Sequence, residues 1–187
     1  MPWRIHKKRH LTSFQVIILG FAGVILFGAL ILMLPISSVQ GIITPFHKAL
    51  FTSTSAVCVT GLVVLDTGSY WSVFGQTVIM FLIQIGGLGV ITTATAVFIL
   101  SGRKISILQR STMQNAISAP KVGGIVRLMS FILKGTLLIE LIGALFMIPV
   151  FCHDFGLRGI WMAIFHSVSA FCNAGFDLLG TKWHPFV

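Results

Sequence analysis

Charged side chains are scarce in this sequence. Asp, Glu, Lys and Arg make up 9% of the 187 residues, whereas soluble domains carry about 25%. Four acidic residues stand against thirteen basic ones, so the formal net charge is +9, and 56% of the residues are hydrophobic. A nucleic-acid partner would require a clustered basic face on a soluble fold, so we expect no such partner. The composition indicates a protein that resides in the membrane.

Cysteine is also sparse, and its spacing follows no pattern. Cys58, Cys152 and Cys172 form no CxxC pair and lack the Cys/His spacing of a zinc site. Isolated small residues in apolar surroundings most simply serve packing. We therefore expect neither a disulfide framework nor a structural metal.

Three long apolar segments account for the composition. Residues 14–34 and 73–100 contain no charge, and residues 128–151 contain only Lys134 and Glu140. Each exceeds the roughly 20 residues that a helix needs to cross the hydrocarbon core. The first is longer than the h-region of a signal peptide, about 7 to 15 residues, and no small-x-small cleavage pattern follows it. We expect an all-α integral membrane protein whose first span is retained.

The basic residues predict the orientation. With a cytosolic N-terminus and alternating spans, the cytosolic side holds nine basic residues and no acid: Arg4, Lys7, Lys8, Arg9, Arg103, Lys104, Arg110, Lys121 and Arg127. The opposite side balances three basic residues with three acids: Lys48, Arg158, Lys182, Asp66, Asp154 and Asp177. Because Lys and Arg favour the cytosolic side, we expect the N-terminus there.

An internal repeat occurs at an offset of 114 residues. Residues 51–61 (FTSTSAVCVTG) align with residues 165–175 (FHSVSAFCNAG) without a gap, and six of eleven positions are identical. Apolar composition does not explain the shared Ser, Ser, Cys and Gly, so duplication is the better interpretation.

Each copy includes a segment too short to cross the membrane. Residues 45–57 and 159–171 have 13 residues each, roughly 20 Å as helix. We expect two re-entrant helices, the first with Thr44 as N-cap and Pro45 as its first residue. Irregular backbone at membrane depth is tolerated only where it is buried in protein or lines a watery cavity. The loops that follow these helices are therefore candidates for an ion pathway.

The chain divides into one complete span–pore helix–span unit and one truncated unit. Residues 1–100 form the first unit, residues 101–127 a basic cytosolic linker, and residues 128–187 the second unit, which stops before its closing span. On this interpretation the chain is a fragment or the product of an interrupted reading frame.

The loops at residues 58–62 and 172–176 have the features of a carbonyl-lined ion filter. Backbone carbonyls replace the hydration shell of a cation without fixed negative charge, and a glycine allows the angles that turn carbonyls toward one axis. Two ordinary glycine turns are the alternative. The candidate filter residues are Cys58, Val59, Thr60, Gly61, Cys172, Asn173, Ala174 and Gly175.

Polar and small residues near these loops have two interpretations each. Gly86, Gly87 and Gly89 indicate close helix packing rather than a phosphate-binding loop, which needs a strand before it. Asp66 and Asp177 follow the loops, as acids at a pore mouth or as solvated surface acids.

Ionisable and hydroxyl side chains also lie within or near the apolar segments. Glu140 would serve either a helix–helix contact or an ion-path role, and Lys134 could extend toward the cytosol. His166 is expected to be packed and hydrogen-bonded rather than a metal ligand. The hydroxyls of Thr92, Thr93 and Thr95 have no histidine or carboxylate beside them, so we expect no enzyme activity.

A family resemblance follows from these motifs. The run QIGGLGVIT at residues 84–92, together with SAVCVTGL and SAFCNAGF in the two loops, resembles the Trk/Ktr/HKT superfamily of potassium transporters, and most of all the bacterial Ktr membrane subunit. The resemblance covers essentially the whole chain. It implies four span–helix–span repeats with four filter segments around one axis, and Gly61 and Gly175 would be two of the filter glycines.

The resemblance also implies a cargo and partners. Potassium would be taken up across the bacterial plasma membrane, and channel-like passage and uptake coupled to or activated by sodium both remain open. A full-length protein would form a homodimer in membrane lipid, on a cytosolic nucleotide-binding regulatory subunit of the KTN/RCK type. No covalent cofactor is expected. The alternative function is a structural or assembly subunit that does not conduct.

Overall fold

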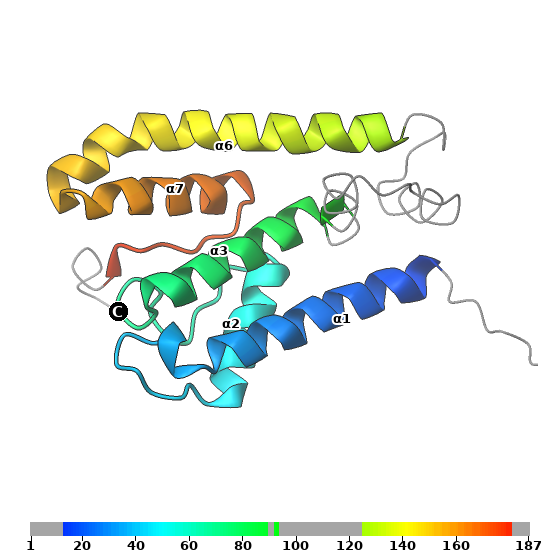
Figure 1. Cartoon of the computed structure of the whole chain (residues 1–187), viewed down its shortest axis with the longest axis horizontal. Helices are drawn as coiled ribbons and strands as arrows, with labels where there is room; N and C mark the ends of the chain where they lie inside the picture. Colours follow the sequence, from blue (N-terminus) through cyan, green and yellow to red (C-terminus); the bar gives the residue numbers. More distant parts are fainter. Residues whose placement is uncertain (1–12, 90–91, 94–124, 181–187) are drawn as a thin grey trace, which may run out of the picture.

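Helices make up the part of the chain that the computed structural model describes, namely residues 13–89, 92–93 and 125–180. No β-strand occurs in this part, as expected for an all-α protein (Figure 1). The elements in chain order are α1 (Ser13–Leu32), the short 3-10 helix η1 (Pro35–Ser37), α2 (Phe46–Val57), α3 (Val73–Leu88), α6 (Ile125–Phe155) and α7 (Arg158–Phe171).

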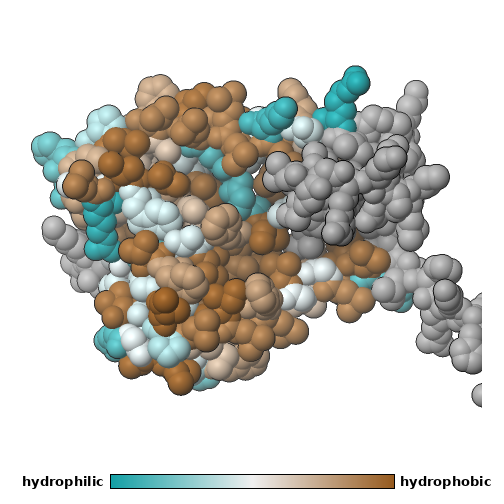
Figure 2. All heavy atoms as spheres, in the orientation of Figure 1, coloured by the Kyte–Doolittle hydropathy of each residue, from teal (hydrophilic) through white to brown (hydrophobic). Residues whose placement is uncertain are grey.

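Two helices, α1 and α6, are long and apolar enough to cross a membrane. They have 20 and 31 residues. In the most apolar part of each, only 17% of the residues are buried inside the protein. Apolar side chains accordingly cover much of the visible surface (Figure 2). Such a surface is compatible with lipid, whose tails are as apolar as leucine.

The third helix, α3, is shorter than the span expected at residues 73–100. It begins after Ser72, whose side-chain oxygen accepts a hydrogen bond from the Gly75 N–H at 3.2 Å, a favoured N-cap. It ends before Gly89, whose φ of 82° lies outside the helical range. The span is therefore interrupted at Gly89, which the sequence analysis did not anticipate. Most of its remainder lies outside the described residues.

The start of α2 differs from the expectation. Pro45 occupies the N-cap position and Phe46 is the first helical residue. The Thr44 hydroxyl does not cap the helix, because it lies 3.1 Å from the Tyr70 hydroxyl and forms a hydrogen bond there. The prediction of Thr44 as N-cap is wrong, since a tertiary partner competes for its side chain.

The helix α6 extends beyond the expected span at both ends. It begins at Ile125, so the last three residues of the expected linker 101–127 are helical. The rest of that linker lies outside the described residues. At the other end, Gly156 has a φ of 61°, a left-handed conformation common after helix C-termini. Arg158 then begins α7.

A tight turn holds α6 and α7 side by side (Figure 1). A Cβ at Gly159 would overlap the backbone of Phe151, so a side chain there would force the two helices apart. The imidazole of His166 on α7 stacks on the Phe151 ring, with 4.9 Å between ring centroids.

The two halves of the chain share one core. Gln76 of α3 is 1% exposed. Its Nε2 donates to the Trp71 carbonyl at 2.9 Å, and its Oε1 accepts a hydrogen bond from Trp161 Nε1 on α7 at 2.9 Å. This buried polar bridge fixes α7 against α3. Around it lie buried apolar side chains from both halves, including Ile79, Ile83, Met162 and Phe165.

Candidate functional site

The loop after α2 begins with a Schellman-type turn. The Thr60 N–H donates to the Ser55 carbonyl at 3.0 Å, and the Val59 N–H donates to the Ala56 carbonyl at 3.3 Å. Val59 has a φ of 56°, in the left-handed region that glycine usually occupies. A β-branched residue in this conformation costs roughly 1–2 kcal/mol. The backbone is therefore strained where the helix turns into the loop.

The loop after α7 repeats this turn at the same offset of 114 residues. The Ala174 N–H donates to the Ser169 carbonyl at 2.7 Å, and the Asn173 N–H donates to the Ala170 carbonyl at 3.0 Å. Asn173 also has a φ of 56°, and Asn is among the few residues that tolerate this conformation well. The repeat in the sequence is thus also a repeat of backbone structure in the two loops.

The glycines of the two loops meet. Gly61 and Gly175 have φ values of 71° and 70°. A Cβ on Gly61 would lie 2.8 Å from the Ala174 carbonyl oxygen, and a Cβ on Gly175 would lie 3.4 Å from the Gly61 Cα. The first distance is too short for a real side chain, so any substitution at Gly61 would push the loops apart. Two segments that are far apart in the sequence therefore form one site.

Both short helices end at this site. Cys58 and Cys172 are the C-cap residues of α2 and α7. A helix C-terminus carries a partial negative charge of about half a unit, which attracts cations. The loops themselves, residues 58–62 and 172–176, contain no charged side chain. The negative potential at the loops thus comes from the helix dipoles and not from charged side chains of the loops.

Matching serine contacts hold the short helices against the long ones. Ser53 Oγ on α2 donates to the Ile25 carbonyl of α1 at 2.7 Å. Ser167 Oγ on α7 donates to the Glu140 carbonyl of α6 at 2.6 Å. Both serines belong to the sequence repeat, but the sequence analysis gave them no role. They connect each long helix to the short helix that precedes a loop.

A glycine faces each of these serines. A Cβ on Gly28 or on Gly143 would lie 2.6 Å from the oxygen of its serine. The sequence analysis missed both glycines, although a signal was present: the triplet Gly-Ala-Leu occurs at residues 28–30 and again at 143–145. The structural repeat therefore includes the contact between each long helix and its short helix.

The loops differ in one hydrogen bond. Ser55 Oγ and Thr60 Oγ1 lie 2.9 Å apart and form a hydrogen bond in the first copy. Ala174 occupies the position of Thr60 in the second copy. There, Ser169 Oγ donates instead to the Phe176 carbonyl at 2.6 Å. In both copies a serine of the short helix stabilises the loop that follows it.

The glycines of α3 lie against both loops. A Cβ on Gly86 would overlap the Val57 carbonyl at the end of α2, and a Cβ on Gly87 would lie 2.5 Å from the Cys172 sulfur. Gly89 differs, because among the described residues its only neighbour would be Thr92 Oγ1 at 4.0 Å. Gly89 terminates the helix, and its packing role stays a prediction.

The two acids after the loops take part in local turns. Asp66 Oδ2 accepts a hydrogen bond from the Ser69 N–H at 2.7 Å, and Asp177 Oδ1 accepts one from the Leu179 N–H at 2.9 Å. Both carboxylates are half-buried. A role at a pore mouth stays a prediction for both residues.

His166 is hydrogen-bonded through both ring nitrogens. Nδ1 donates to the Met162 carbonyl at 2.7 Å, and Nε2 accepts a hydrogen bond from the Leu178 N–H at 3.3 Å. Because a carbonyl only accepts and an N–H only donates, the ring is neutral and Nδ1 carries the proton. His166 is therefore a packed, hydrogen-bonded residue, as expected, and it connects α7 to the segment after the second loop.

The cysteines are free thiols. Cys172 packs against Gly87, whereas Cys58 is exposed, so the packing role expected for Cys58 is wrong in this structure. Among the described residues, no group of three or more His, Cys, Asp and Glu could hold a metal ion.

The described residues fit an all-helical integral membrane protein, and two of their helices are apolar and long enough to cross a membrane. The chain belongs to the TrkH family of cation transport proteins, whose model matches residues 7–187.

Several relatives are potassium uptake proteins. The chain is 47% identical over 181 residues to the potassium/sodium uptake protein NtpJ of Enterococcus hirae, and this match covers 96% of the chain and 40% of that protein. It is 43% identical to the Ktr system potassium uptake protein B of Bacillus subtilis, covering 94% of the chain and 39% of the relative. The corresponding Vibrio alginolyticus protein is 38% identical, with 92% and 38% covered. The chain thus spans about two fifths of the length of these relatives.

Proposed function

We propose that the two loops are two segments of a potassium-selective filter in a Trk/Ktr-type uptake protein. The observation that carries the proposal is the meeting of Gly61 and Gly175, each in a left-handed conformation, at the ends of two short helices. Membership in a cation transport family and the names of the relatives support it.

The chemistry of the loops suits a potassium ion. A filter selects by replacing water with carbonyl oxygens, and the loops offer carbonyls without a charged side chain. The helix C-termini add a negative potential. Conduction also requires that the bound ion can be released, and neutral carbonyls bind a cation without a fixed negative charge.

Two segments do not complete a filter. Four segments around one axis are what the family resemblance implies, and the relatives are about two and a half times as long as this chain. The remaining segments would come from the rest of a longer protein that contains this sequence and is as long as the relatives. A non-conducting structural or assembly role for the chain is the second candidate, because one and a half units alone leave the pathway open on one side.

The finer assignments belong to the same proposal. The units would be residues 1–100 and 128–187, with Asp66 and Asp177 at the extracellular mouth and the N-terminus in the cytosol of a bacterium. The complete protein would be a homodimer with a cytosolic KTN/RCK-type nucleotide-binding subunit. Sodium would act as a coupling or activating ion; the Enterococcus relative is named a potassium/sodium uptake protein.

The test substitutes glycines in a protein that contains this sequence and is as long as the relatives. Gly61→Ser should abolish most potassium uptake by uptake-deficient bacteria, because the added Cβ meets the Ala174 carbonyl. Gly41→Ser is the matched control: Gly41 has a similar φ of 67°, but no atom of the described residues lies within 4 Å of its Cβ position. Both variants carry the same backbone strain, so their difference isolates the contact between the loops.

Cysteine substitutions in the same loops are compared with the glycine substitutions in the same uptake assay. Cys58→Ser and Cys172→Ser keep the backbone carbonyls and should retain uptake and its resistance to sodium, with membrane expression matched to the wild type. Active Gly61→Ser protein alongside inactive cysteine variants would reject the carbonyl filter and point to a thiolate site.

A further inference from the structure

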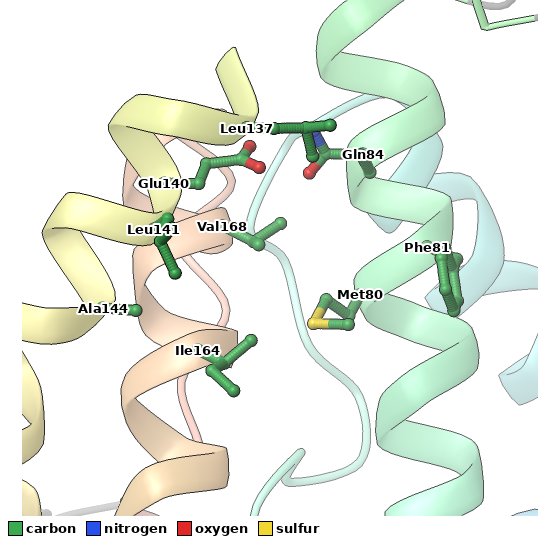
Figure 3. A pocket seen from close by; sticks show the side chains of 9 residues that line it. All are labelled: Met80, Phe81, Gln84, Leu137, Glu140, Leu141, Ala144, Ile164 and Val168. Atoms are coloured by element: carbon green, nitrogen blue, oxygen red, sulfur yellow. The ribbon is translucent and has the colours of Figure 1, made fainter. Parts of the chain in front are cut away.

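A cavity of about 310 Å³ lies between α3, α6 and α7 (Figure 3). Two of its lining side chains are polar, Glu140 of α6 and Gln84 of α3, and they face each other across it. The rest of the lining is apolar: Met80, Phe81, Leu137, Leu141, Ala144, Ile164 and Val168.

The polar atoms in this cavity are buried, and Glu140 and Gln84 are close enough to interact with each other. Glu140 is 7% exposed. Its Oε1 and both the Oε1 and Nε2 of Gln84 form no hydrogen bond of normal geometry within the part of the chain that the structure describes. Burial of a polar group without a partner is costly, and burial of an unpaired charge is more costly still. Within the described residues, the cavity therefore lacks a component that would satisfy all of these groups.

The donors and acceptors do not balance. A carboxylate offers about four acceptor sites and an amide oxygen about two, whereas the amide nitrogen of Gln84 supplies only two N–H donors. When Glu140 is ionised, acceptor sites remain even if Gln84 donates both N–H groups to it, and the negative charge of the carboxylate is unpaired. The missing component should therefore be cationic and should only donate hydrogen bonds. Ammonium and guanidinium groups meet both conditions.

The shape of the lining excludes a bare metal ion and favours an apolar stem. A bare cation needs several oxygen ligands, and two side chains here offer too few. Apolar residues surround the polar pair, and they would pack against methylene groups, as they do around the stems of Lys and Arg.

We propose that this cavity binds one ammonium or guanidinium group carried on an apolar stem, with the Glu140 carboxylate as counter-ion and the Gln84 amide oxygen as second acceptor. The natural source is a Lys or Arg side chain on another membrane helix, one that lies outside this chain in a protein as long as the relatives. The relatives extend well beyond this chain, and a basic side chain inside a membrane requires such a partner. This assignment does not depend on the filter proposed above.

The first experiment measures binding of n-butylguanidinium to the purified chain in detergent, with n-butanol as the neutral probe. Wild-type protein should bind the cation, and Glu140→Gln should weaken binding at least about ten-fold, the loss expected for a charge-assisted hydrogen bond. Ala144→Leu should also weaken it by filling the cavity while it keeps the carboxylate. Asp154→Asn is the matched control, because it removes an exposed carboxylate of the same helix and should bind as wild type.

Three results would overturn the proposal. One is butylguanidinium binding that is unchanged in both Glu140→Gln and Ala144→Leu. Another is equal affinity for n-butanol, which would indicate a merely apolar cavity. The third is stabilisation by potassium or sodium chloride alone that requires Glu140, which would indicate a site for a bare ion.

A labelling experiment identifies the source of the cation. Dicyclohexylcarbodiimide, which modifies carboxyl groups in apolar surroundings, should label Glu140 in the purified chain, and butylguanidinium should protect it. In a protein as long as the relatives, protection of Glu140 from labelling without added cation would identify an internal Lys or Arg side chain. Protection only after the cation is added would identify a soluble amphipathic cation as the source. Labelling that no cation alters in either protein would refute the site.

Discussion

The contact between Gly143 and Ser167 gives a quantitative prediction about the link between α6 and α7. A Cβ on Gly143 would lie 2.6 Å from Ser167 Oγ, which donates to the Glu140 carbonyl at 2.6 Å. Gly143→Ala must therefore displace this hydroxyl or move the helices apart. Gly135→Ala on the same helix is the control, because no atom in the described part of the chain lies within 4 Å of its Cβ position.

The size of the effect follows from three contributions. Loss of the serine hydrogen bond costs about 1 kcal/mol, and overpacking at the contact costs about 2 kcal/mol. Alanine in place of glycine inside a helix stabilises the protein by about 1 kcal/mol through its higher helix propensity. Gly143→Ala should thus destabilise the protein by about 2 kcal/mol, whereas Gly135→Ala should stabilise it by up to about 1 kcal/mol.

A double substitution separates the clash from other causes. Ser167→Ala alone should cost about 1 kcal/mol, the hydrogen bond. Gly143→Ala combined with Ser167→Ala removes the clash and keeps the gain in helix propensity, so it should be close to wild type. Equilibrium unfolding in mixed micelles measures all four proteins. A Gly143→Ala variant as stable as Gly135→Ala, or a double variant less stable than Gly143→Ala, would refute the close contact.

Two further predictions address the loop and the orientation. Val59→Asn should stabilise the protein by roughly 1 kcal/mol in the same unfolding assay, because Asn tolerates the left-handed φ that Val59 adopts; a destabilised variant would show that the valine side chain matters more than the strain. A reporter enzyme fused after Leu65 should be extracytoplasmic and one fused after Gln109 cytosolic, because basic residues cluster around the latter; the reverse result would invert the orientation and the filter entrance with it.

Local features of the fold could be predicted well. Apolar runs of sufficient length indicated the helices α1 and α6, and the repeat between residues 51–61 and 165–175 marked the positions of α2 and α7. These features depend on residues that are adjacent in the sequence. The errors occurred where a distant residue competes: Thr44 bonds to Tyr70 rather than capping a helix.

The break at Gly89 shows a different kind of limit. Three glycines within four residues were all read as packing residues, since each lacks a side chain. Only the backbone angle distinguishes Gly89, with its φ of 82°, from Gly86 and Gly87, which lie in the helix against the two loops. A glycine permits several conformations, so its identity alone does not say which one the chain adopts.

The sequence by itself determined the membrane class, the duplication and the two loops, because hydropathy and local repeats need no knowledge of contacts. The tertiary structure alone decided that Gly61 meets Gly175, that Ser167 faces Gly143, and that Glu140 and Gln84 face one cavity. A helix that is apolar on all sides has no polar face to reveal its orientation. Which side of α1 or α6 meets protein and which side meets lipid is therefore set by packing between helices, through small residues that allow close approach.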